Sequence, residues 1–334
     1  MRPQCYTTFA IFFALVGAQP ACANDSEAET AVGGFTLVKS DSISMDSEDL
    51  FISRDLVRVK YRFTNKSDAP IETLVAFPLP DIPPTDAENT SYWSEKGGIK
   101  FKTKIDGKPI DFETVEQAIF KDKDLSARLT ALKLPLNRLA KDFEDALKKV
   151  PKAEVAKLVA DGLMENTGSE EYPNWVANWS LRTTITRHQT FPANATVTVE
   201  HEYKPLAGGS VGGNLDAWRR KDKELEKEFN QTLSRYCIDK EWLASFDRIE
   251  KTKRTDMGAY SEVWLGYVLK TGANWKGPIG DFRLVVDKGK ADSLVSFCMD
   301  GVKKISPTRF EVRRKNFTPD RDLDILIIDW WNRN

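Results

Sequence analysis

The chain has 334 residues, with 49 Lys and Arg against 50 Asp and Glu, so its formal net charge is −1. The length suits roughly two domains, each able to bury its own core. The near-zero charge gives no general electrostatic reason to bind nucleic acid. With 41% hydrophobic and 30% charged residues, the chain is neither disordered nor a multi-span membrane protein.

The first 23 residues have the pattern of a secretory signal peptide. Arg2 is followed by an apolar run over residues 8–16, and residues 21–23 (Ala-Cys-Ala) have the small-residue spacing of a cleavage site. We therefore expect cleavage after residue 23, a mature chain that begins at Asn24, and export to the periplasm, which is favoured, or secretion. No later apolar stretch approaches about 18 residues, so we expect no membrane span.

Export changes what the four cysteines can do. Cys5 and Cys22 leave with the signal peptide, and Cys237 and Cys298 remain. An even pair in an oxidising compartment favours a disulfide bond between these two residues. Two buried free thiols are the alternative.

The mature chain begins with β patterns. In residues 57–63 (VRVKYRF), apolar and basic side chains alternate, which predicts a half-buried antiparallel strand. Further strands are expected at residues 35–38, 50–53 and 73–77, and Asp106-Gly107 predicts a hairpin between residues 100–105 and 109–112.

The hydrophobic period changes between residues 113 and 165. Leucines and other apolar residues recur at helical spacing, and Pro135 and Pro151 separate three short amphipathic segments. This pattern predicts a helical insertion in a β domain.

The pattern returns to β after the insertion. Two strands, at residues 179–187 and 196–203, are expected to form one hairpin. A glycine-rich stretch at residues 208–213 is interpreted as a hinge, and it is followed by a charged helix over residues 216–237 and a second helix capped by Asp239. Short strands fill the rest of the chain.

These elements predict a mainly β fold with helical insertions: two β-sandwich-like, antiparallel domains joined by a helical segment. The first domain would span residues 24–212, with the helical insertion near residues 113–165. The second would span residues 213–334, as a helical connector followed by a C-terminal β-sandwich.

The familiar catalytic and metal-binding motifs are missing from the sequence. It contains no H-E-x-x-H, C-x-x-C, G-x-S-x-G or Walker A motif. His188 and His201 fall on the two arms of the expected hairpin, about 20 Å apart at ~3.3 Å per residue. We expect no metal, no cofactor and no assignable catalytic residue; whether the protein is an enzyme stays open, with the balance against it.

Tryptophan provides the best candidates for a binding surface. Trp175 and Trp179 lie in PNWVANW, and Trp275 follows Asn274 in ANWKGP. Tryptophan is common at interfaces, so Trp175, Trp179, Asn274 and Trp275 are taken as the candidate surface for a protein or glycan partner. Packing of these rings in the core is the alternative.

Several sequence blocks resemble a known family of bacterial exported proteins. They are NDS (24–26), SMDSEDLFIS (44–53), VRVKYRFTN (57–65), LVAFPLPDI (74–82), TGANWKGPIGDFRLVVDKG (271–289) and FTPDRDLDIL (317–326). They are similar to domain-of-unknown-function family 4424 over essentially the whole mature chain. The resemblance implies a cell-envelope or secreted protein of bacteria, and it implies no reaction.

Three functions are therefore considered. The first is an exported non-enzymatic protein that binds a protein or glycan partner in the envelope or outside the cell. The second is a hydrolase of glycans or peptidoglycan, with an unassigned pair of carboxylates. The third is a structural component of the cell envelope. The oligomeric state is open in all three.

Overall fold

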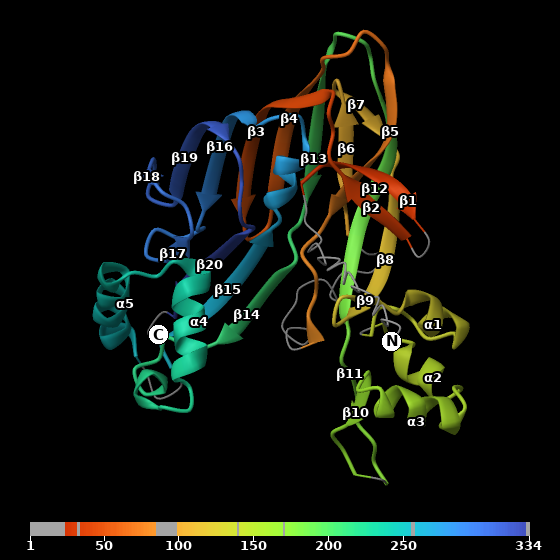
Figure 1. Cartoon of the computed structure of the whole chain (residues 1–334). Helices are drawn as coiled ribbons and strands as arrows, with labels where there is room; N and C mark the ends of the chain where they lie inside the picture. Colours follow the sequence, from red (N-terminus) through yellow and green to blue (C-terminus); the bar gives the residue numbers. More distant parts are fainter. Residues whose placement is uncertain are drawn as a thin grey trace, which may run out of the picture.

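The computed structural model describes residues 24–31, 34–84, 99–138, 140–169, 171–254 and 258–331. The expected signal peptide, residues 1–23, lies outside the described residues. Within them the chain is mainly β with helical insertions, as the sequence predicts, and most strand pairs are antiparallel (Figure 1). None of the helices in the described part is long and apolar enough to cross a membrane.

An eight-stranded sheet is the largest element of the fold. Its strand order is β18-β19-β16-β3-β4-β13-β6-β7, and only the β16–β3 pair is parallel. The strands are β3 (Ile43–Ser53), β4 (Val57–Asn65), β6 (Lys102–Ile105), β7 (Lys108–Ile110), β13 (Thr196–Tyr203), β16 (Ile279–Asp287), β18 (Lys303–Lys304) and β19 (Arg309–Phe317). In β4 the buried and exposed side chains alternate, which confirms the pattern predicted for VRVKYRF.

Two smaller sheets share a core with the large one. The six-stranded sheet has the order β2-β1-β5-β12-β8-β9, and the four-stranded sheet has the order β14-β15-β20-β17. The main hydrophobic core contains side chains from all three sheets, such as Phe63, Phe77 and Val263. The strands are β1 (Ser26–Ala31), β2 (Gly34–Val38), β5 (Ile71–Pro78), β8 (Glu113–Phe120), β9 (Lys123–Asp124), β12 (Ser180–Phe191), β14 (Ala207–Val211), β15 (Tyr260–Tyr267), β17 (Leu294–Phe297) and β20 (Leu323–Trp330).

The expected division at residues 212 and 213 does not separate two cores. Strands from both sides of it belong to the eight-stranded sheet, where β3 pairs with β16. The glycine-rich stretch is also no free hinge, because its first half is the edge strand β14, paired with β15. A Cβ at Gly209 would lie 2.6 Å from the carbonyl oxygen of Glu262, so glycine here allows close approach of two backbones.

The helical insertion forms a second core at one end of the six-stranded sheet. It contains α1 (Ser126–Ala131), α2 (Phe143–Leu147) and α3 (Lys152–Ala160), with the short strands β10 (Met164–Asn166) and β11 (Trp175–Ala177). Helices follow Pro135 and Pro151 as expected, but the first of them, α2, begins only at Phe143. The insertion is shorter than residues 113–165, because Glu113–Phe120 is the strand β8. Figure 1 shows these helices projecting from the ends of β8 and β12, well apart from α4 and α5.

The helices α4 (Glu226–Tyr236) and α5 (Lys240–Lys253) cover the outer face of the four-stranded sheet and build a third core with it. The short η3 helix (Arg219–Lys221) precedes α4 and has no buried residue. The side chain of Asp239 accepts a hydrogen bond from the Trp242 backbone N–H at 2.7 Å, so the expected cap is confirmed. Cys237 and Cys298 form the expected disulfide, with a Cα–Cα distance of 5.0 Å. It joins the end of α4 to the end of β17.

Candidate functional site

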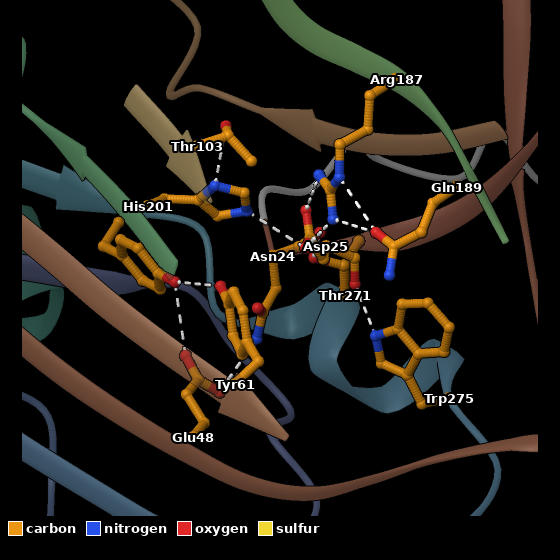
Figure 2. Close-up of polar contacts among 11 residues, drawn as sticks. Asn24, Asp25, Glu48, Tyr61, Thr103, Arg187, Gln189, His201, Thr271 and Trp275 are labelled. Atoms are coloured by element: carbon orange, nitrogen blue, oxygen red, sulfur yellow. Dashed lines mark hydrogen bonds and ion pairs between the residues drawn. The ribbon is translucent and has the colours of Figure 1, made fainter. Parts of the chain in front are cut away.

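The first described residues of the chain lie inside the main core. Asn24, Asp25 and Ser26 are each 0% exposed, and β1 begins at Ser26. Figure 2 shows Asn24 and Asp25 among the side chains of Glu48, Arg187 and His201. The backbone carbonyls of Asn24 and Asp25 accept hydrogen bonds from buried side chains: Thr271 Oγ1 lies 2.9 Å from the Asn24 oxygen, and Trp275 Nε1 lies 2.6 Å from the Asp25 oxygen. The turn that contains η4 (Lys270–Asn274) therefore holds this segment from one side.

Asp25 makes a buried ion pair with Arg187 from β12. The two terminal guanidinium nitrogens lie 3.0 and 2.7 Å from the two carboxylate oxygens. Gln189 accepts from the same guanidinium, at 3.0 and 2.9 Å. Burial alone would raise the pKa of Asp25, but Arg187 and His201 hold that pKa well below its usual value. Asp25 is therefore an anion in the folded chain.

His201 from β13 is the third partner in this cluster. Its Nε2 lies 3.1 Å from the Asp25 carboxylate, and its Nδ1 lies 3.1 Å from the hydroxyl of Thr103. Burial lowers the pKa of His201, against the opposing effect of Asp25. We therefore assign a neutral imidazole that donates from Nε2 to Asp25 and accepts at Nδ1 from Thr103.

Glu48 from β3 is the second buried acid of the cluster. Its carboxyl oxygens accept from Asn24 Nδ2 at 3.0 Å and from the Tyr267 hydroxyl at 3.3 Å. The hydroxyls of Tyr267 and Tyr61 lie 2.8 Å apart. Burial raises the pKa of Glu48 to about 8, with a further contribution from Asp25. Among the described residues, no Lys or Arg is within ion-pair distance of this carboxyl.

The cluster of Asn24, Asp25, Glu48, Arg187 and His201 holds a segment of chain, and it does not face an open cavity. All five residues are buried, and the pockets described below are lined by other residues. Most polar groups of the cluster are hydrogen-bonded, although among the described residues Asn24 Oδ1 and Gln189 Nε2 have no partner. A buried hydrogen-bonded network of this kind rigidifies a core and favours a single arrangement. Its chemistry is therefore that of an anchor for the N-terminal segment.

The four residues of the expected binding surface do not form one surface. Trp275 and Trp179 are 1% and 0% exposed, so an exposed role is wrong for both rings and the alternative of core packing holds. Trp275 packs in the main core, and Asn274 beside it donates to Ser26 Oγ at 3.0 Å. Trp179 packs in the core of the helical insertion, where its Nε1 donates to the Leu136 carbonyl at 2.8 Å.

Trp175, the fourth residue, lines a pocket. The pocket has a volume of about 490 Å³ and lies on the helical insertion. Its lining is mostly apolar: Leu147, Val150, Val155, Ala156, Pro173 and Trp175, with Glu144, Lys148 and Lys152 as the charged members. Concave apolar sites with few polar groups are the usual form of binding pockets.

A more polar groove of about 770 Å³ runs beside β14 and includes Glu262 and Asp329. Burial raises the pKa of Glu262 to about 7, as expected for an acid of a hydrolase. However, Asp329 is in register with Ser261, the neighbour of Glu262, so the two carboxyl side chains project from opposite faces of the sheet. The groove therefore does not bring this pair of carboxyls together. In the described part of the chain, no group of three or more His, Cys, Asp or Glu could hold a metal ion.

The cluster that anchors Asn24 and Asp25 was not predicted from the sequence, partly because the strands now labelled β12 and β13 were expected to pair with each other. β12 pairs with β5 and β8 in the six-stranded sheet, whereas β13 pairs with β4 and β6 in the eight-stranded sheet. His188 and His201 are therefore not on one hairpin. A usable signal existed, because His201 has the same phase in β13 as the buried Val197, Val199 and Tyr203.

Comparison with known proteins gives a family and no activity. No curated protein matches the chain. Among solved structures, one from Legionella pneumophila subsp. pneumophila str. Philadelphia 1, described as a "putative nutrient binding protein", is similar with a TM-score of 0.46 and 14% identity, over 92% of this chain and 70% of that one. The family whose description is "Domain of unknown function (DUF4424)" matches residues 23–326. This match runs from the residue before the buried Asn24 into β20, and the chain belongs to that family.

Proposed function

We propose that the protein is exported, to the periplasm or out of the cell, and that it binds a partner protein without catalysing a reaction. The binding site is the pocket on the helical insertion, which takes up apolar side chains of the partner. The observation that carries this proposal is the apolar pocket beside Trp175. Trp175, a candidate residue from the sequence, is half-buried and lines this concave site.

The lining favours a protein over a glycan. Sugar hydroxyls need several convergent hydrogen-bonding groups, whereas six of the nine lining residues are apolar. Tyr172, which precedes the lining residue Pro173, is 75% exposed and adds aromatic surface at the edge of the pocket. Of the charged groups at the rim, Glu144 offsets one lysine, and Lys148 already pairs with Asp145 at 3.0 Å. Lys152 is then the group that can attract an acidic residue flanking the apolar anchors of a partner segment.

Two features support export. The first is the signal-peptide pattern of residues 1–23. The second is the disulfide between Cys237 and Cys298, because such bonds persist in oxidising compartments. Fractionation of the bacterium, with sequencing of the N-terminus of the recovered protein, tests this part. Recovery of an uncut chain in the cytoplasm would contradict it.

Site-specific photo-crosslinking in cells tests the pocket. A photoreactive phenylalanine analogue is placed at Ala156, which lines the pocket, or at Ala153, an exposed alanine on the same helix that does not. We expect a protein adduct of defined mass from position 156 alone. Equal adducts at both positions, or none at either, would contradict the proposal; no adduct together with an osmotic-sensitivity phenotype of a deletion strain would favour a structural role.

The identified partner is then tested with purified proteins. Ala156→Asp places a carboxylate in the apolar lining, whereas Ala153→Asp places it about one turn earlier on α3, outside the lining. Because an unpaired charge loses hydration in an apolar site, we expect Ala156→Asp to weaken binding by about tenfold or more, and Ala153→Asp to change it less than about twofold. Equal affinities of the two variants would place the interface elsewhere.

A further inference from the structure

The backbone nitrogen of Asn24 lies inside the main core, close to a buried acid. The Asn24 side chain reaches Glu48, with Nδ2 3.0 Å from Oε2. Four covalent bonds separate Nδ2 from the backbone nitrogen of the same residue, so that nitrogen is within about 8 Å of the Glu48 carboxyl. Asn24 itself is 0% exposed, so the nitrogen is shielded from water.

The cluster contains one buried acid, Glu48, that has no positively charged partner among the described residues. Asp25 and Arg187 neutralise each other, and His201 is neutral. The charged and titratable groups that face Glu48 are Asp25, Tyr61 and Tyr267, and none of them supplies a positive charge. Consistent with this, burial raises the pKa of Glu48 to about 8. One additional cation near Asn24 would complete the cluster.

We propose that cleavage before Asn24 supplies this cation, and that the new α-ammonium group forms a buried ion pair with the Glu48 carboxylate. A peptidase hydrolyses the amide bond between Ala23 and Asn24 and consumes one water molecule. The products are a carboxylate on Ala23, which leaves with the signal peptide, and an α-ammonium group on Asn24. The proton of Glu48 is released to solvent as the pair forms.

The ion pair makes processing a step in folding. Before cleavage the nitrogen of Asn24 is a neutral amide in a fully buried residue, so it supplies no positive charge to Glu48. After cleavage the terminus fits the core and carries the missing charge. This inference depends on cleavage between Ala23 and Asn24 and does not depend on the pocket. If N-terminal sequencing showed that the exported chain begins at another residue, the ion pair would be ruled out and the proposed partner binding would be unaffected.

Four purified chains test the ion pair. One begins at Asn24, released from a fusion that leaves no extra residue, and one retains Ala23 as a single added residue; each is made with Glu48 and with Glu48→Gln. Because the added residue displaces the ammonium group, we expect it to lower the midpoint of thermal unfolding by about 4 °C or more when Glu48 is present. With Glu48→Gln the same extension should lower the midpoint by less than about 1 °C. An equal loss in both backgrounds would show a steric effect alone and overturn the proposal.

A second measurement covers the case in which Glu48→Gln prevents folding. The chain that begins at Asn24 is treated with an amine-specific acylating reagent, and modification of the α-amino group is followed by peptide mass analysis. We expect modification to be at least about tenfold slower in the folded chain than in urea, because the amine is buried and charged. Rates that match between the folded and unfolded chains would overturn the proposal.

Discussion

The carboxylate of Asp25 meets the guanidinium of Arg187 in a two-pronged ion pair, at 3.0 and 2.7 Å, and their side chains are 0% and 2% exposed. The two residues are 162 positions apart in the chain, so the pair ties the N-terminal segment to β12. Desolvation offsets much of the attraction in such pairs, but losing one partner leaves a buried charge uncompensated. The contact is therefore a strong determinant of where the segment lies.

Asp25→Asn is the sharpest test of this contact. It keeps the shape of the side chain and removes its charge, so we expect it to lower the free energy of unfolding by about 3–5 kcal/mol. Urea unfolding followed by tryptophan fluorescence measures the change. The control is Asp49→Asn, because Asp49 pairs with Arg283 on the surface and its side chain is 52% exposed. That change should cost at most about 1 kcal/mol, and equal losses would contradict the buried pair.

Glu262 provides a prediction on pH. Burial raises its pKa from 4.5 to about 7, with Asp216 contributing. The folded chain thus binds this proton more tightly than the unfolded chain, so the stabilising contribution is complete below about 4.5 and is lost as the pH rises through about 7. We expect Glu262→Gln to gain stability relative to the parent chain over this window. Urea unfolding at a series of pH values measures the difference.

A matched substitution distinguishes the effect of Glu262 on the pH dependence of stability from the effects of the other titratable groups. Glu165→Gln changes an exposed carboxyl on β10 and should leave the slope of stability against pH unchanged. A Glu262→Gln chain whose stability follows the same slope as the parent would show that this carboxyl is not desolvated in solution.

The elements that the sequence predicted correctly are those whose signal is local. Alternation in β4 and the cap at Asp239 depend on neighbouring residues, and the disulfide followed from counting cysteines in the expected mature chain. The pairing of strands could not be predicted in this way. Periodicity shows which face of a strand is buried, but it does not show which strand lies beside it. The parallel pairing of β3 with β16 joins residues more than two hundred positions apart, and this pairing removed the expected domain boundary.

The anchoring cluster was hidden for the same reason. His201 is in phase with the apolar residues of β13, and Arg187 is in phase with Ile185 and Phe191 of β12, so both are directed inward. Their common partner Asp25 lies 176 positions before His201. An inward-facing charge signals a buried partner, but only the assembled sheets show which residue it is.

The disulfide should contribute substantially to the stability of the protein. The bond joins residues 61 positions apart and connects α4 to β17. In the chain-entropy account, a loop of this size is stabilised by roughly 4 kcal/mol, so replacing Cys237 and Cys298 together by Ser should lower the free energy of unfolding by up to that amount. Denaturant unfolding of the parent chain, with and without reductant, gives the matched comparison. If the reduced parent and the double variant kept the stability of the oxidised parent, the bond would not constrain the unfolded chain.

Gly213 permits Glu262 to occupy its buried position. A Cβ at residue 213 would lie 1.8 Å from Oε1 of Glu262, whose other oxygen accepts from Trp264 Nε1 at 2.8 Å. The φ angle of Gly213 is not in the left-handed region, so the backbone itself does not require glycine. We therefore expect Gly213→Ala to force the carboxyl away from Trp264 and to cost about 1–3 kcal/mol of unfolding free energy.

A double-mutant cycle identifies the cause of that loss. In a Glu262→Ala background the obstructing carboxyl is gone, so adding Gly213→Ala should cost less than about 0.5 kcal/mol. The free energy of unfolding of the four chains is measured in urea at one pH below 7, where Glu262 is protonated in the folded parent. If Gly213→Ala lowered the free energy of unfolding equally in both backgrounds, glycine would be required at residue 213 by the backbone and not by the Glu262 carboxyl. The packing of β14 against β15 would then be sufficient to explain the glycine-rich stretch.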